Sequence, residues 1–76
     1  MIKLSNVALA DFRRYLKASG LNNIRSNGGH ETWARADLTR PVTIQSHIDP
    51  VPEFIVKQVL RTLGHSREDF AKTLAS

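Results

Sequence analysis

The sequence contains no cysteine, and this absence excludes two classes of small protein. Disulfide-stapled domains need paired cysteines, and thiolate metal sites need several of them. The chain also lacks a run of about 18 apolar residues, the length that a membrane-spanning helix requires. Its first residues show no apolar stretch typical of a secretory signal. We therefore expect a single domain over residues 1–76, located in the cytoplasm and without a membrane partner.

Acidic charge is scarce relative to basic charge. The chain has 11 Lys and Arg against 7 Asp and Glu, a formal net charge of +4. The whole excess lies in residues 1–48, which hold seven basic and three acidic residues. Positive charge favours polyanionic partners, because each phosphate neutralised by a protein cation releases counterions. The alternative interpretation is a basic surface that serves only solubility.

Apolar residues at helical spacing predict a first helix over residues 6–19. They are Leu9, Phe12, Tyr15 and Leu16. Ser5 is the expected N-cap, because its hydroxyl can accept a hydrogen bond from a free N–H of the first turn. Gly20 is expected to end the helix, since glycine adopts the left-handed conformation without strain.

The period of the hydrophobic pattern then changes to two, which predicts three strands over residues 21–26, 30–36 and 41–46. Asn27-Gly28 predicts a tight hairpin between the first two strands, because a type I′ turn needs two residues with positive φ. Ile24 is the expected buried residue of the first strand. In the third strand, Val42 alternates with Thr43, so the two side chains face opposite sides of the sheet.

A second helix is predicted between Pro52 and Gly64, with a broad apolar face. That face consists of Phe54, Ile55, Val56, Val59, Leu60 and Leu63. Ser66 and Asp69 have the spacing of a capping box, which predicts a last short helix to about Leu74. His65 is expected to be a solvated residue of the turn before it.

These elements predict an α+β fold of order α-β-β-β-α with a short C-terminal helix. Two main helices on one face of a three-stranded antiparallel sheet would bury both apolar stripes and leave the other sheet face open. The same order is found in the double-stranded-RNA-binding domain, which recognises RNA by shape and phosphate contacts.

His30 is the candidate catalytic residue, because it stands directly after Gly28-Gly29, where missing side chains permit a close backbone approach. An imidazole has an ordinary pKa of about 6.5 and can transfer protons near neutral pH. Strand alternation puts His30 on the face opposite Glu31 and Trp33. Trp33 is either a core residue or a base-stacking platform. A single Trp in a thin core favours the first, which directs His30 to the open face.

Five cations are candidates for holding a phosphate, and the alternative for each is a solvated surface charge with no binding role. They are Arg25, Arg35, Arg40, Lys57 and Arg61. Glu31 would repel a phosphate unless Arg25 or Arg35 balances its charge. Two placements are possible for His47: near the open face of the sheet, or in the loop before the prolines. The three histidines lack a cluster of acidic residues at ligand spacing, so no metal site is expected.

The stretch GGHETW, followed by RPVTIQSHIDPVPEFIVKQVLRTLGHSREDF, resembles the HicA family of bacterial toxin–antitoxin toxins. Members of that family are small mRNA-degrading proteins. The resemblance extends from the first helix to Phe70. It implies the double-stranded-RNA-binding type of fold and a catalytic role for His30. It also implies a HicB-type antitoxin as the partner that covers the active face in a hetero-oligomer.

The sequence thus predicts a metal-independent endoribonuclease, an mRNA interferase without a cofactor, with His30 as general acid or base. The predicted RNA-binding residues are Gly28, Gly29, Arg25, Arg35, Arg40, His47 and Lys57. A non-catalytic RNA-binding domain has the same fold and charge but does not need His30. A module that binds only proteins through its open face is a third hypothesis, and it predicts no salt-dependent affinity for RNA.

Overall fold

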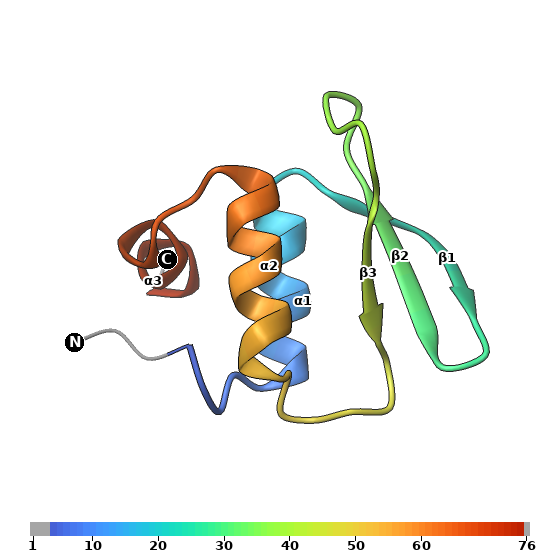
Figure 1. Ribbon diagram of the computed structural model, residues 1–76, viewed down its shortest axis with the longest axis horizontal. Coiled ribbons are helices and arrows are strands. Elements are labelled where there is room, and N and C mark those ends of the chain that lie inside the picture. Colours follow the sequence, from blue (N-terminus) through green and yellow to red (C-terminus); the bar gives the residue numbers. More distant parts are fainter. Residues whose placement is uncertain (1–3, 76) are drawn as a thin grey trace.

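The computed structural model describes residues 4–75 and confirms the expected α+β order. Its elements are α1 (Leu9–Ala18), β1 (Asn22–Asn27), β2 (His30–Ala34), β3 (Val42–Gln45), α2 (Glu53–Leu63) and α3 (Arg67–Ala75). The strands form one antiparallel sheet in the order β1-β2-β3. The sheet stands on one side of α1 and α2, and α3 lies on the other side of that pair (Figure 1). Among the helices of residues 4–75, none has the length and apolar character needed to cross a membrane.

Alternation along β2 decides which side chains enter the core. Trp33 is 6% exposed and lies among the buried apolar residues, which confirms it as a core residue. Its antiparallel partner Val42 and the neighbouring Ile44 are buried beside it. The other buried apolar side chains come mainly from the helices and include Phe12, Tyr15, Leu16, Val56, Val59, Leu60 and Phe70. The core therefore lies between the inner face of the sheet and the pair α1 and α2, and it continues to Phe70 of α3, which packs on Phe12 and Tyr15.

Glu31 is the only polar residue buried in the core of residues 4–75. Its carboxylate accepts hydrogen bonds from the guanidinium of Arg13 on α1, with Nε 3.2 and 3.1 Å from the two oxygens. Nη2 of Arg13 also donates to Glu31 Oε2, and the indole N–H of Trp33 donates to Oε1 at 3.1 Å. The prediction that Arg25 or Arg35 balances the charge of Glu31 was wrong. Glu31 lies on the helix-covered face of the sheet, where Arg13 of α1 supplies the cation.

The start of α1 differs from the prediction. The helix begins at Leu9, with Ala8 as an N-cap that has no side-chain bond, so Ser5 is not the cap. The backbone N–H of Leu9 instead donates to Oδ1 of Asp49 at 3.0 Å. Next to this contact, the N–H of Val51 donates to the carbonyl of Val7 at 2.8 Å. A distant loop therefore satisfies the first turn of α1.

Two apolar residues expected in the core lie at the surface. Ile24 is 63% exposed, because the register of β1 shifts between Asn23 and Arg25 and leaves Ile24 as the extra residue of a bulge. The buried apolar residue before β1 is Leu21, at 1% exposure. Phe54 is 68% exposed, because the core-facing stripe of α2 runs through Val56, Val59 and Leu60 instead.

The helix ends follow the predicted chemistry more closely. Gly64 directly follows α2 with a φ of 70°, and Gly20, with a φ of 90°, follows Ser19, the C-cap residue of α1. The capping box of α3 is confirmed, with the Ser66 N–H donating to Asp69 Oδ2 at 2.9 Å and the Asp69 N–H to Ser66 Oγ at 3.1 Å. Each of these residues satisfies backbone groups that a helix end leaves free.

His65 is half-buried rather than solvated. Its Nδ1 lies 2.6 Å from the hydroxyl of Tyr15, and the two rings meet edge to face at 5.8 Å between centroids. Burial raises the pKa of Tyr15 to about 12, so this hydroxyl stays protonated at neutral pH. The contact joins α1 to the turn between α2 and α3, which explains why the turn is not free in solvent.

We predict that Glu31→Gln lowers the free energy of unfolding at pH 7 by about 2 kcal/mol, because the replacement loses charge-assisted hydrogen bonds in a buried position. The hydrogen bond from Arg13 holds the pKa of Glu31 below its ordinary value. The contribution is therefore fully present above the unfolded pKa of about 4.3. It disappears as the pH falls through the folded pKa. Urea unfolding between pH 7 and 3 measures this difference.

The control is Asp11→Asn, which removes the exposed ion pair with Arg14 and is expected to cost less than about 0.5 kcal/mol. As the pH falls, the wild type should lose this contribution, and the difference in stability between it and Glu31→Gln should shrink. A constant difference between the two proteins across the whole pH range contradicts the assignment.

Candidate functional site

The turn between β1 and β2 consists of Gly28 and Gly29, with φ values of 58° and 85°. Because Asn27 pairs with His30, these two glycines are the central residues of a two-residue hairpin. Positive φ at both positions is the requirement of a type I′ turn. The predicted hairpin is therefore confirmed, but its centre lies one residue later than Asn27-Gly28.

The group that approaches Gly29 is the imidazole of His47. Its Nδ1 lies 3.3 Å from the carbonyl oxygen of Gly29, to which a protonated Nδ1 donates a hydrogen bond. The backbone N–H of Ser46 donates to the same oxygen at 2.8 Å. A Cβ atom on Gly29 would stand 2.9 Å from Nδ1 of His47, closer than real Cβ contacts allow. Gly29 therefore makes room for an imidazole next to His30.

His30 begins β2 and is exposed. It is in register with Asn27 of β1 and Gln45 of β3, and paired residues of an antiparallel sheet share a face. Glu31, the next residue, is on the helix-covered face, so His30 is on the uncovered one. The structure thus places His30 on the face that the sequence predicted. Its cross-strand neighbours there are two amide residues, Asn27 and Gln45.

Arg25 is the predicted cation that lies closest to His30 in the sheet. It is in register with Thr32, which is two residues after His30 and on the same face. Arg25 is exposed, and within residues 4–75 no acidic group forms an ion pair with it. Its charge is therefore available to a ligand on the open face.

The other predicted cations are not gathered around His30. Nε and Nη2 of Arg35 donate to the carboxylate of Asp37 at 2.6 and 3.0 Å, and Nη1 donates to the Ser19 carbonyl at 2.7 Å. Arg40 precedes β3, at the end away from Gln45. Lys57 forms an ion pair with Glu53 on α2, at 3.2 Å.

Arg61 also belongs to α2 and is exposed. The structure therefore divides the predicted cations between the open sheet face and the helical side. Sequence spacing could not show this division, because it depends on strand register and on the bulge in β1. The same register adds Asn27 and Gln45, which the sequence analysis did not select, to the neighbourhood of His30.

Two imidazoles, those of His30 and His47, lie at the end of the sheet next to the β1–β2 turn, and imidazole is the side chain most often used as a general acid or base. The His47 ring contacts Gly29, the residue directly before His30. The third histidine, His65, contacts the Tyr15 hydroxyl in another part of the fold. In residues 4–75, no three His, Asp or Glu side chains gather in the way that a metal ion would require. The arrangement can therefore support acid–base chemistry on a polar ligand that lies on the uncovered face.

Comparisons with protein-family models, with curated proteins and with solved structures gave no match to this chain.

We predict that Gly28→Ala and Gly29→Ala destabilise the protein to a similar extent, by about 1–2 kcal/mol each, because both residues have positive φ. Only Gly29→Ala should displace the His47 ring, since a Cβ on Gly28 meets no atom within 4 Å. Imidazole NMR signals report the difference. Equal movement of the His47 signals in the two variants contradicts a specific contact with Gly29.

Proposed function

We propose that this chain is a metal-independent endoribonuclease that binds and cleaves mRNA, the toxin of a toxin–antitoxin pair. The observation that carries the proposal is the exposed imidazole of His30 on the uncovered sheet face, with the His47 imidazole held against the preceding residue. A polyanion that crosses this face meets His30 and the unpaired charge of Arg25. The net charge of +4 supports a polyanionic ligand.

The proposed reaction starts with attack of a ribose 2′-OH on the adjacent phosphorus. The P–O5′ bond breaks, leaving a 2′,3′-cyclic phosphate on one fragment and a 5′-OH on the other. One group removes the 2′-OH proton and another protonates the departing 5′ oxygen. His30 serves as one of these groups, and His47 is the candidate for the other, because its ring is fixed to the Gly29 carbonyl beside His30.

Arg25 is the proposed phosphate ligand at this site. Its guanidinium would offset the negative charge that develops on the phosphate oxygens as the 2′-OH attacks. The amide side chains of Asn27 and Gln45, in register with His30 on either side, offer donors and acceptors to a ribose or base. Arg35 contributes to the fold, because Asp37 and the end of α1 already occupy its guanidinium.

We further propose that the fold is of the double-stranded-RNA-binding type and that a HicB-like antitoxin neutralises the toxin. The order α-β-β-β-α and the bare sheet face support the first proposal. The resemblance in GGHETW and in the segment from Arg40 to Phe70 supports the second. A bound antitoxin that covers the face of His30 would exclude RNA from the histidines.

His30→Ala is expected to lower RNA cleavage by ~10²–10⁴-fold, the usual contribution of a general acid or base. RNA binding should persist, because the cations are unchanged. Purified wild type and variant are compared by the rate of fragment formation from a labelled oligoribonucleotide and by its retention in a binding assay. Unchanged cleavage in the variant contradicts the role of His30 and favours the non-catalytic RNA-binding domain.

The substrate provides a second control. An oligonucleotide with a single 2′-deoxy sugar at the cleavage position should resist cleavage there, because it lacks the attacking group. Cleavage at that position would refute the 2′-OH mechanism while leaving nuclease activity itself in place.

Arg25→Ala is expected to weaken RNA binding and to reduce the salt dependence of the affinity by about one released counterion. Arg14→Ala is the matched control, because Arg14 is an exposed arginine on α1, away from the sheet, and pairs with Asp11. Titration of a fluorescent oligoribonucleotide at several salt concentrations measures both slopes. Equal slopes for the two variants contradict a phosphate contact by Arg25.

A further inference from the structure

β3 is an edge strand, because within residues 4–75 it pairs with β2 and with no further strand. The N–H of Ser46 donates to the carbonyl oxygen of Gly29, the residue directly before β2. Hydrogen-bonded and non-hydrogen-bonded pairs alternate along an antiparallel ladder, so Ile44 and Val42 also direct their backbone groups toward β2. Thr43 and Gln45 therefore direct their N–H and C=O groups to the free edge. An edge of this kind is a template for another strand.

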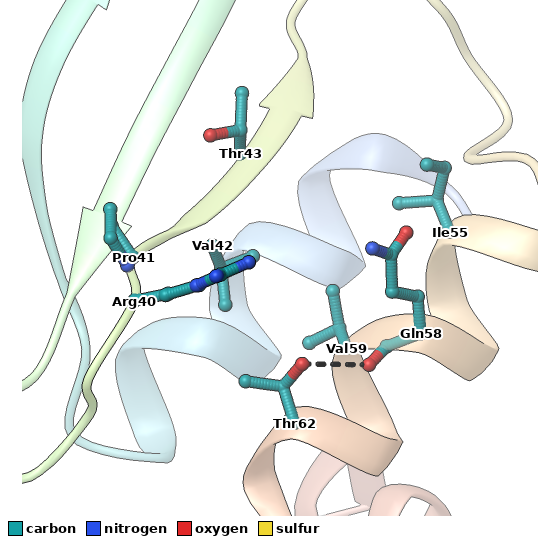
Figure 2. A pocket seen from close by; sticks show the side chains of 8 residues that line it. All are labelled: Arg40, Pro41, Val42, Thr43, Ile55, Gln58, Val59 and Thr62. Carbon is teal, nitrogen blue, oxygen red and sulfur yellow. Dashed lines mark hydrogen bonds between the residues drawn. The ribbon is translucent and has the colours of Figure 1, made fainter.

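A groove of about 320 Å³ runs beside this edge, between the start of β3 and α2. Pro41 and Val42 form one wall, and Ile55 and Val59 form the other (Figure 2). Thr43, Gln58 and Thr62 also line it, so the groove offers both apolar and polar surface next to free backbone groups.

Arg40 gives the groove its charge. It extends from the start of β3 across the space toward α2 (Figure 2). No acidic residue lines the groove, and within residues 4–75 no acidic group pairs with Arg40. An occupant with a carboxylate would supply the missing counter-charge.

We infer that this groove binds an extended, acidic segment of a partner protein, which adds to β3 as a further strand. Main-chain hydrogen bonds to Thr43 and Gln45 would supply affinity, and the groove and Arg40 would select apolar and acidic side chains. The site lies at the sheet edge and on the helical side. It does not depend on the ribonuclease proposed for the open face.

Two other occupants fit the groove less well. Single-stranded RNA binds on aromatic platforms, and no aromatic side chain lines the groove. A second copy of the chain would present its own β3 edge, and residues 38–48 contain no acidic side chain to meet Arg40. An acidic peptide satisfies both the backbone edge and the guanidinium.

The test uses three capped hexapeptides and the full chain labelled with ¹⁵N. The first peptide alternates Val and Glu, the second has Lys in place of Glu, and the third is the first peptide N-methylated at each Val. The first should shift the amide signals of Thr43 and Gln45. The second and third should bind about tenfold more weakly, because they lose the charge pair or the backbone hydrogen bonds.

Arg40→Glu should weaken binding of the Val–Glu peptide about tenfold. Arg14→Glu makes the same charge change at an exposed position of α1. It should leave the affinity within about twofold at 0.15 M salt. Binding should also persist in His30→Ala, which separates this inference from the fate of the ribonuclease proposal.

Three results would overturn the inference. One is an equal affinity for all three peptides, or amide shifts confined to other elements. Another is a steeply salt-dependent shift of Thr43 and Gln45 by an oligoribonucleotide that displaces the peptide, which would make the groove an RNA surface. The last is concentration-dependent dimerisation that shifts the same amides without peptide, which would assign the edge to a second copy.

Discussion

The buried carboxylate of Glu31 is the constraint on which the placement of the site depends. A charged group in a small core is tolerated only when other groups satisfy it, and here Arg13 and Trp33 do so. A shift of one residue in β2 would move Glu31 into solvent and His30 into the core, since the side-chain period of a strand is two. The ion pair therefore fixes both the register of β2 and the face on which His30 lies.

The end of the sheet that carries His30 is built from a short turn. Gly28 and Gly29 allow a two-residue loop between β1 and β2, and the pairing of β2 with β3 places the end of β3 alongside the start of β2. The position of His47 then follows from the missing side chain of Gly29. The glycine dipeptide thus forms the turn and leaves room for the His47 ring beside the residue that precedes His30.

Local patterns predicted the elements of the fold and the face of His30. The period of two in β3, the capping box at Ser66 and the core position of Trp33 all depend on near neighbours in sequence, and the structure confirms them. The errors arose where distant residues decide. Ser5 was a reasonable cap by its local sequence, but Asp49 binds the first turn of α1 from another loop. Tertiary contacts of this kind leave no periodic signal.

The candidate site shows the same division. His30 was found from its neighbours, whereas the contact between His47 and Gly29 required the pairing of β2 with β3. The separation of Arg25 from Arg35 and Arg40 also depends on register and on the bulge that extrudes Ile24. A sequence lists the charged groups, but the ladder decides which of them share a surface.

The loop between β3 and α2 has a mechanical consequence. It is fastened at His47 to the hairpin, at Asp49 to the first N–H of α1, and at Val51 to the segment before that helix. We therefore expect movement of the chain ahead of α1 to affect the imidazole beside the turn, although 40 positions separate Leu9 from Asp49. A change at the beginning of the protein can in this way alter how firmly the opposite end of the sheet holds its ring.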